Sequence, residues 1–384
     1  MYTTDAWVLH RGDPDRPEPA QIRREPFTFA DLAADEVLVE PLFGCWEGNY
    51  SHAIARSPID ICAARNEDKV VIGNSGVVRV PKPGTAVQGL LEGDVCMVAG
   101  AFGFDKYGHM TTVFGFDAPN TIGLMAKRTK IAARCLLPIP QGDAYSLRQW
   151  AAFSVRYTTA WSNWKVALGA LRLLVSESDL PAPFVWGWGG GSTLAELDLA
   201  RRVGCQTAMI SGRSSRLEVI RRLGIHPVDR RHFKDLHFDE HRLRSDPEFR
   251  ERYTASERAF LDHVREHTGG EGVSIFLDYI GTPVTRCTLK SLSRQGVIAT
   301  AGWREGTTVA YNRAAACIRR HTHVHTHGFR RSEAVDAMQY AQQTGWLPPI
   351  SEELCRFDDL PLLAARFAAD AVDSYFPLFE INPP

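Results

Sequence analysis

The pattern of apolar and polar positions changes character near residue 150. Before it, short apolar stretches are separated by turns rich in proline and glycine, and the stretches at 36–43, 69–80 and 94–100 predict strands. From about residue 151, apolar stretches alternate with amphipathic ones. This alternation predicts a parallel, doubly wound sheet, because each helix crosses over to the next parallel strand. We therefore expect an α/β chain with a β-rich first part.

The second part of the chain predicts an ordered series of elements. We expect helices at 147–169, 192–203, 214–223, 257–267 and 284–293, and strands at 184–186, 205–211, 273–280, 296–302 and 322–326. The segment 229–256 is long, charged and poor in apolar residues, and we expect a surface insertion there. After about residue 342 short segments return, which we expect to rejoin the first part.

A cluster of glycines follows the apolar run at 184–186 and comes directly before a helical pattern. This order of strand, tight turn and helix is typical of a dinucleotide site. Glycines let a pyrophosphate approach bare N–H groups, and the helix N-terminus adds partial positive charge. The expected pyrophosphate ligands are Gly187, Gly189, Gly190, Gly191 and Ser192.

Composition excludes several classes of function. The 384 residues suffice for two domains, and the net charge is −1, with no basic excess to neutralise nucleic-acid phosphates or bind a membrane surface. No apolar run approaches the ~20 residues that span a bilayer, and the charged N-terminus does not look like a signal peptide. We expect a cytoplasmic protein. Its eight cysteines are scattered without a C-x-x-C pair, so no zinc knuckle or redox dithiol is predicted.

The residues after the glycine turn indicate which nicotinamide cofactor is used. An NAD site places a carboxylate about 20 residues past the turn, to hold the ribose 2′-hydroxyl. Here the strand ends in Ser211, Arg213, Ser214 and Arg216, and the first carboxylate is Glu218. Guanidinium and hydroxyl groups favour the 2′-phosphate of NADPH. The alternative is that the arginines only decorate a surface helix.

Several motifs together resemble the medium-chain dehydrogenase/reductase superfamily. They are the strand entry at 93–95 (GDV), TTAW at 158–161, the glycine turn, the block 265–281 and GVIATAGW at 296–303. The resemblance implies a GroES-like catalytic domain at 1–150, a Rossmann domain at 151–341, a return to the catalytic domain at 342–384, and a homodimer. The charged insertion is similar to that of the crotonyl-CoA carboxylase/reductase branch, whose members are enoyl reductases.

The departures from that superfamily concern zinc and the glycine turn. Where the zinc-dependent branch has a Gly-His-Glu motif, this chain has Asn74 between glycine and serine, so the imidazole ligand is absent. Cys45 stands where that branch has its first zinc cysteine. A catalytic zinc needs three protein ligands, so a zinc-independent enzyme is expected. Thr193 replaces the third glycine of the turn, which should widen helix–strand packing slightly.

The resemblance also indicates residues near the nicotinamide. It places the loop after Cys45 there, with Glu47 at a position used for proton handling; a buried carboxyl could act as an acid. The alternative is a structural turn in which Glu47 forms a salt bridge. Relatives contact the nicotinamide amide around Tyr157 and Thr158, although plain helix packing is an alternative there. The enoyl reductase branch also indicates an active-site histidine at His327.

Four histidines alternate along residues 321–327 and should project from one face of a strand. Neighbours on that face stand ~7 Å apart, too far for all four to bind one ion. A metal site at His323, His325 and His327 is therefore the less favoured reading. A subunit interface or a polar cluster is the alternative.

These patterns favour an NADPH-dependent reductase of an activated C=C bond, such as an enoyl thioester or enone. Loss of the zinc histidine fits this acceptor, since a conjugated bond needs less Lewis-acid help than a plain ketone. A metal-assisted alcohol or carbonyl dehydrogenase and a nucleotide-binding protein without catalysis remain the alternatives.

Overall fold

The computed structural model describes residues 1–13, 15, 18–140, 142 and 145–384. It divides into two compact units. The first comprises Met1–Thr158 and Gly328–Pro384, and the second comprises Thr159–His327. Helix α4 (Arg156–Arg172) runs from the end of the first unit into the second.

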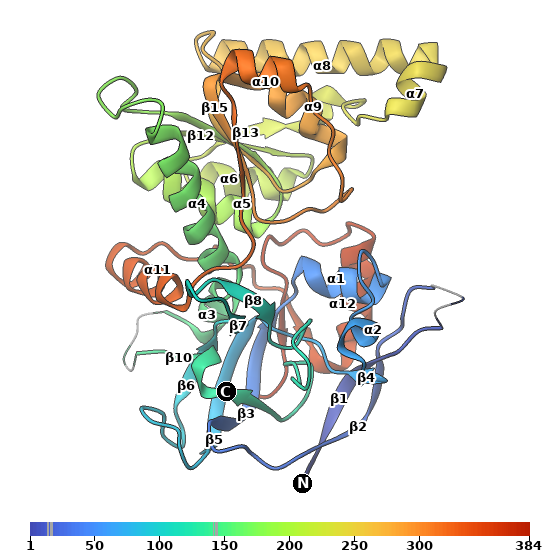
Figure 1. Cartoon of the computed structure of the whole chain (residues 1–384), viewed down its shortest axis with the longest axis vertical. Helices are drawn as coiled ribbons and strands as arrows, with labels where there is room; N and C mark the ends of the chain where they lie inside the picture. The colour runs from blue at the N-terminus through green and yellow to red at the C-terminus, as the bar shows by residue number, and fades with distance from the viewer. Residues whose placement is uncertain (14, 16–17, 141, 143–144) are drawn as a thin grey trace. The chain divides into compact units, whose positions relative to one another are not determined.

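The first unit is rich in short strands (Figure 1). Its elements are β1 (Tyr2–His10), β2 (Arg23–Phe29), β3 (Glu36–Cys45), α1 (Gly48–Ala55), α2 (Ile61–Arg65), β4 (Lys69–Val70), β5 (Gly76–Pro83), β6 (Val95–Val98), β7 (Ala101–Phe104), β8 (Met110–Val113), β9 (Thr129–Ala132), η1 (Ala133–Cys135), β10 (Leu136–Pro138), α3 (Leu147–Phe153), α11 (Arg331–Thr344), β17 (Leu354–Arg356), η3 (Phe357–Asp359), α12 (Leu360–Ala368) and β18 (Leu378–Glu380). The expected strand 69–80 is two strands, since residues 71–75 leave the ladder.

The main sheet of the first unit has the order β10-β6-β5-β3-β18-β17, and β9 also pairs with β3. The C-terminal segment contributes to this sheet because β18 pairs antiparallel with the end of β3, Phe379 opposite Gly44. A side chain at position 44 would collide with the Phe379 ring, so this pairing requires a glycine. The pairing holds the loop that follows β3 against the end of the chain.

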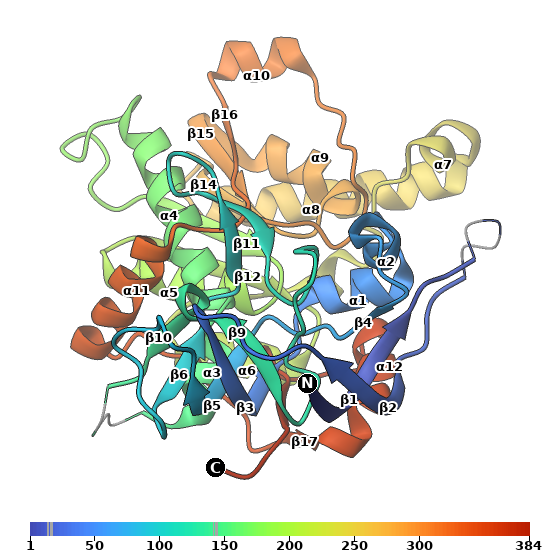
Figure 2. The same ribbon diagram turned by 60° about the horizontal axis from the view of Figure 1, so that its bottom comes forward.

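The second unit contains a six-stranded sheet in which all strands are parallel, in the order β13-β12-β11-β14-β15-β16 (Figure 2). Its elements are β11 (Phe184–Trp188), α5 (Gly191–Arg202), β12 (Gln206–Ser211), α6 (Ser214–Arg222), β13 (His226–Asp229), η2 (Arg230–Phe233), α7 (Glu240–Ser245), α8 (Pro247–His267), β14 (Val273–Asp278), α9 (Thr282–Ser291), β15 (Leu292–Thr300), α10 (Arg313–Arg319) and β16 (Thr322–His325). The predicted doubly wound parallel sheet is confirmed. The direction of winding reverses between β11 and β14, where sheets of this kind bind ligands beyond the carboxyl ends of their strands.

Two predicted helix boundaries were wrong. The helix expected at 147–169 is two helices, α3 and α4, separated at residues 154–155, and the helix expected from 257 begins at Pro247. Asp246 caps that second helix by accepting a hydrogen bond from the Phe249 N–H, and Pro247 occupies its first turn. Both features are ordinary start signals for a helix.

The segment 229–256 is exposed over most of its length, as expected, but it also packs apolar side chains into the core. It forms η2, α7 and the first half of α8, and four of its apolar side chains are buried in the core of the second unit: Phe233, Leu236, Phe249 and Tyr253. Within α8, Phe249, Tyr253, Phe260 and Val264 fall on one helical face. The many charged residues between them concealed this spacing. In Figure 1, α8 is the long helix drawn in yellow.

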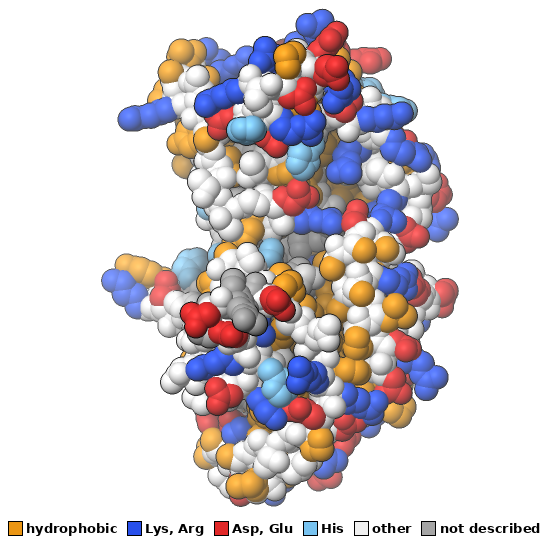
Figure 3. Space-filling model, turned by 90° about the vertical axis from the view of Figure 1, so that its right-hand side faces the viewer, with side chains coloured by type: hydrophobic (Ala, Val, Ile, Leu, Met, Phe, Trp, Pro, Cys, Tyr) orange, Lys and Arg blue, Asp and Glu red, His pale blue; other side chains and the backbone are white. Residues whose placement is uncertain are grey.

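Charged side chains of both signs are intermixed over the face drawn in Figure 3, in keeping with a net charge of −1. None of the helices in the described ranges is both long and apolar enough to cross a membrane.

Replacing Phe249 with alanine tests whether this segment belongs to the core. The side chain is 5% exposed, so Phe249→Ala should lower the free energy of unfolding by about 3–5 kcal/mol. Glu251→Ala, an exposed change two residues away on the same helix, should change it by less than ~0.5 kcal/mol. Chemical denaturation followed by circular dichroism measures both. Equal effects of the two changes on the free energy of unfolding would show that this segment does not belong to the core.

Candidate cofactor site and active site

The glycine turn joins β11 to α5 at the point where the sheet reverses. Gly189 has φ +149°, and Gly190 precedes the helix with open space around the position of a side chain. No side chain caps the first N–H groups of α5. Bare N–H groups at the start of a helix attract an anion through hydrogen bonding and the helix dipole. The turn therefore has the form of a phosphate site, and Gly191 and Ser192 open the helix beside it.

Thr193, which replaces the third glycine of the turn, fits under the other two. Its side chain is fully buried and its hydroxyl donates a hydrogen bond to the Trp188 carbonyl over 3.2 Å. A Cβ placed on Gly187 would lie 2.6 Å from the Thr193 methyl carbon, and one on Gly189 would collide with its hydroxyl. The threonine therefore makes glycine necessary at both positions.

The predicted ribose-phosphate ligands gather at the end of β12 and the start of α6. Ser211 ends the strand and is buried, Arg213 stands at the N-cap of α6, and Ser214 and Arg216 lie in its first turn. No side chain caps this helix either. The structure thus brings all four residues to one corner of the second unit.

Sequence reasoning missed a further arginine at this corner. Arg230 directly follows β13, the strand beside β12, and its Nε lies 3.7 Å from the place of a Cβ on Gly212. The carboxylate before it, Asp229, is held by Arg231 with Nη2 to Oδ2 at 2.6 Å. The clue was available, because parallel strands end at the same edge and residue 230 follows the strand next to β12.

A buried polar cluster lies behind the glycine turn in the second unit. Asn163 of α4 donates to both carboxyl oxygens of Glu196 over 3.0 and 3.1 Å, and Tyr279 donates to one of them over 2.9 Å. Thr326, after β16, donates to the Asn163 oxygen over 2.7 Å. Desolvation raises the pKa of Glu196 to about 8, against the lowering effect of those donors. Sequence reasoning missed Glu196 because it lies inside an apolar helical pattern.

The histidines of 321–327 are spread along an edge strand. His323 packs against the Tyr311 ring at 4.6 Å between centroids, whereas His325 and His327 are exposed. His327 follows β16 at the carboxyl edge of the sheet, with the Trp303 ring 6.3 Å away. Among the described residues, these histidines do not form a group of three ligand atoms close enough to share one ion. The strand period keeps them apart.

In the first unit, Glu47 forms a buried ion pair with Arg156. Their Oε2 and Nε atoms are 2.9 Å apart, and both side chains are under a tenth exposed. The guanidinium also donates to the carbonyls of Trp46 and Tyr375. Ser75 donates to the other Glu47 oxygen over 3.0 Å. The salt bridge that was the structural alternative for Glu47 is present.

The hydroxyl of Ser75 continues this network toward the backbone of β5. It lies 2.8 Å from the Ser154 hydroxyl, which accepts from the Gly76 N–H over 3.0 Å. The Tyr50 hydroxyl accepts from the N–H groups of Asn74 and Ser75. Asn74 is 2% exposed, and its side-chain oxygen is buried without a hydrogen-bond partner. A buried amide oxygen without a hydrogen bond costs free energy, and such atoms are uncommon in folded proteins.

The other predicted residues of the first unit are buried and contact neighbouring protein groups. Desolvation raises the pKa of the buried Cys45 thiol well above its ordinary value. Tyr157 stacks on Phe153 at 4.9 Å and contacts Trp346 at 4.6 Å. The Thr158 hydroxyl donates over 2.6 Å to the carbonyl of Ser154, which lies between α3 and α4.

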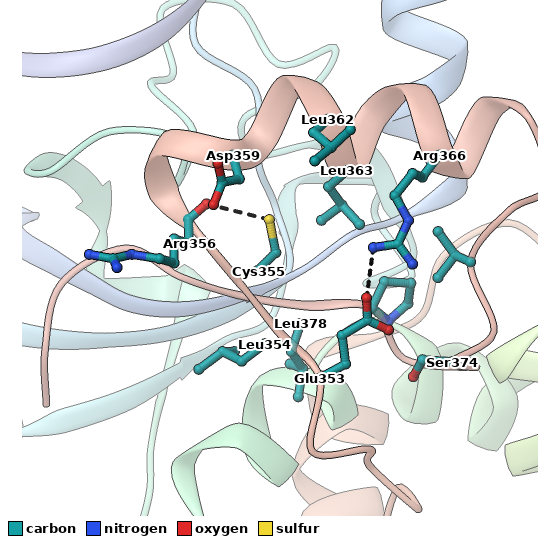
Figure 4. A pocket seen from close by; sticks show the side chains of 12 residues that line it. Glu353, Leu354, Cys355, Arg356, Asp359, Leu362, Leu363, Arg366, Ser374 and Leu378 are labelled. Atoms are coloured by element: carbon teal, nitrogen blue, oxygen red, sulfur yellow. Dashed lines mark hydrogen bonds and ion pairs between the residues drawn. The ribbon is translucent and has the colours of Figure 1, made fainter.

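A pocket of about 320 Å³ lies between α12 and the ends of β17 and β18 (Figure 4). Arg366 and Glu353 on its wall are paired with one another at 2.7 Å. Burial raises the pKa of Cys355, also on the wall, to about 11, so the thiol is protonated near neutral pH. The pocket therefore offers neither an unpaired Arg366 nor a thiolate.

Replacing Glu196 with glutamine tests its protonation. The folded state keeps a proton up to about pH 8, whereas the unfolded chain loses it near 4.5, so stability should fall as pH rises through that window. Glu196→Gln should flatten this dependence, because its amide accepts from Asn163 and donates to Tyr279 without a titratable proton. The melting temperature at pH 8 should then rise by several degrees. The exposed Glu271→Gln is the control, and equal pH slopes in parent and Glu196→Gln proteins would contradict the assignment.

Comparison with solved structures confirms the fold that the resemblance implied. The crotonyl-CoA carboxylase/reductase AntE in complex with NADP is 21% identical, with a TM-score of 0.78 over 99% of this chain and 95% of that one. The 2-octenoyl-CoA carboxylase reductase CinF in complex with NADP and 2-octenoyl-CoA is 19% identical, with a TM-score of 0.80 over 100% and 88%. An alcohol dehydrogenase from the archaeon Aeropyrum pernix is 18% identical, with a TM-score of 0.74 over 98% and 99%. No family model and no curated protein sequence matches the chain. At these identities the chain has the two-domain fold of medium-chain dehydrogenases and reductases.

Proposed function

We propose that this protein is an NADPH-dependent oxidoreductase that reduces an activated C=C bond, as in an enoyl thioester or an enone. The observation that carries the proposal is the carboxyl edge of the parallel sheet. There the bare turn at Gly189–Gly191 opens α5, and Ser211 and Arg213 stand where an NAD site needs a carboxylate. This arrangement suits a dinucleotide whose ribose bears a phosphate.

The residues present at this edge fit NADPH. The N–H groups of Gly191 and Ser192 would hold the pyrophosphate, and Arg213, Arg216 and Arg230 would surround the 2′-phosphate with Ser211 and Ser214. NADPH supplies a hydride when bound. That two neighbours by fold, AntE and CinF, were solved with NADP supports this choice.

The donor set in the first unit favours a conjugated acceptor over a plain ketone. Asn74 stands where zinc-dependent relatives have an imidazole, and Cys45 is a buried neutral thiol. Without that imidazole these groups do not supply the three protein ligands that a catalytic zinc needs. An enone or enoyl thioester spreads the incoming charge onto its own carbonyl, so it demands less electrophilic help. The unsatisfied Asn74 oxygen is free to receive a donor from a ligand.

The reaction then divides between the cofactor and one acid. Hydride adds to the β-carbon of the acceptor, the π-electrons move to the carbonyl oxygen, and the enolate takes a proton at the α-carbon. Glu47 is committed to Arg156 and Ser75, so we assign it a positioning role. His327 is exposed at the carboxyl edge of the sheet, and we assign the proton to its imidazole or to water it holds.

A homodimer is also proposed. Strand β16 is the edge of the six-stranded sheet. Ile318 in helix α10, which precedes this strand, is 70% exposed, and Tyr311 before that helix is 53% exposed. An open strand edge next to apolar side chains supports pairing with a second copy.

The cofactor assignment predicts a selective kinetic effect. Arg213→Ala with Arg216→Ala should raise the Michaelis constant for NADPH by roughly 10- to 100-fold, because charge-assisted hydrogen bonds to the phosphate are lost. The constant for NADH should stay unchanged. Arg221→Ala, an exposed change at the far end of α6, should affect neither. Equal effects on the Michaelis constants for both cofactors would show that the two arginines do not bind the 2′-phosphate and only lie on a surface helix.

The reaction itself is tested by a substrate panel of enoyl thioesters, enones, ketones and alcohols, with NADPH oxidation as the signal. We expect turnover of a conjugated acceptor, with deuterium from labelled NADPH at the β-carbon. His327→Gln should lower kcat by about 100-fold or more while NADPH binding is kept, and the exposed His325→Gln should act normally. Turnover of alcohols with stoichiometric zinc would favour a metal-assisted dehydrogenase. Tight NADPH binding without any turnover would favour a non-catalytic protein.

A further inference from the structure

We propose a divalent metal site, suited to zinc, at His226, His263 and His267 in the second unit. One ligand atom from each imidazole lies within 4.8 Å of the others. His226 opens β13, and the other two lie one turn apart near the end of α8. The site would fasten the long crossover helix to the edge strand of the sheet.

The spacing of the three residues explains why they meet. Residues four apart on a helix share a face with Cβ atoms about 5–6 Å apart, and the ring centroids of His263 and His267 are 4.0 Å apart. The His226 ring lies 4.6 Å from that of His267 and 6.2 Å from that of His263. A tetrahedral zinc with bonds of ~2.0–2.1 Å holds its ligand nitrogens about 3.3–3.4 Å apart, so the imidazoles would rotate inward from separations of up to 4.8 Å to bind it.

Hydrogen bonding leaves nitrogen atoms available to a metal. His267 Nδ1 lies 2.9 Å from the backbone oxygen of His263, so its proton is held there and Nε2 carries the lone pair. An imidazole oriented by a backbone carbonyl is the usual arrangement of a metal ligand. His263 Nε2 is buried and has no hydrogen-bond partner. That unsatisfied atom is the independent sign of a ligand at this place.

An aromatic ring borders the cluster. The Trp186 ring centroid lies 5.9 Å from that of His263 and 6.3 Å from that of His267. Three imidazoles beside an apolar ring make a borderline-soft donor set that suits zinc.

The position in the sheet argues for a structural role. His226 begins β13, so the cluster is at the amino edge of the parallel strands, opposite the carboxyl edge that carries the glycine turn. A bound ion would join α8 to β13 and stabilise the fold of the second unit, with water or an anion as fourth ligand. The inference does not depend on the proposed reaction.

The test uses the full chain without an affinity tag, freed of metal by a chelator and titrated with zinc and cobalt. We expect one equivalent to bind, with a tetrahedral cobalt spectrum, and affinity that falls as the pH is lowered. Removing one partner that only orients a ligand costs 10- to 100-fold, so His263→Gln or His267→Gln should weaken binding by at least about 100-fold. His241→Gln, an exposed histidine on α7, should bind like the parent.

Two further measurements keep the result clear if a variant folds poorly. Saturating zinc, at ~100 times Kd, should raise the melting temperature of the parent by roughly 5–10 °C and that of His263→Gln hardly at all. In the unaltered chain, zinc should protect the three histidines from acylation while His241 stays reactive. Stoichiometric binding that survives the double change His263→Gln and His267→Gln, or no saturable binding at all, would overturn the proposal. NADPH binding by the same variants separates this outcome from failure of the proposed function.

Discussion

The buried ion pair of Glu47 and Arg156 is the interaction on which the first unit most depends. Arg156 neutralises Glu47 and donates to the carbonyls of Trp46 and Tyr375, so it joins the loop after β3, the start of α4 and the C-terminal return. Segments far apart in the sequence meet at one cation. Removing either partner would leave the other charge buried without compensation, at a cost of about 3–5 kcal/mol. The ion pair therefore couples the assembly of the three segments. Of the two alternatives for Glu47, the salt bridge is the one whose contacts are present.

The second unit is organised by a steric constraint at the glycine turn. Thr193 fills the space beside Gly187 and Gly189, so neither position can carry a side chain in the turn where α5 presents its N–H groups. The buried Glu196 cluster joins that helix to α4 and to Thr326. With a pKa near 8, Glu196 is mostly protonated at neutral pH, so the cluster adds no net charge behind an anion site. A departure from the usual glycine pattern is thus absorbed by local packing, and the site keeps its form.

The sequence predicted those features whose physical cause is local. The alternation of strand and helix, the glycine turn and the Ser211–Arg216 corner all follow from spacing along a few residues. Arg156 could not be found in this way, because its partners lie in two segments far from it in the sequence, the loop at Trp46 and Glu47 and the C-terminal return at Tyr375. The burial of Phe249 and Tyr253 was hidden by surrounding charges, although their spacing of four was present. Local sequence patterns therefore fail to predict contacts between distant segments and apolar faces that lie among many charged residues.

The histidines show the same difference between spacing and contact. Four of them alternate conspicuously in 321–327, but a strand sets same-face neighbours ~7 Å apart, and the described residues there bring no three ligand atoms together. His263 and His267 attract no notice in the sequence, yet one helical turn brings their ring centroids to 4.0 Å and the crossover to α8 brings His226 against them. A count of histidines along a chain therefore does not locate the three imidazoles that lie closest together. The helical repeat and the parallel crossover bring them together.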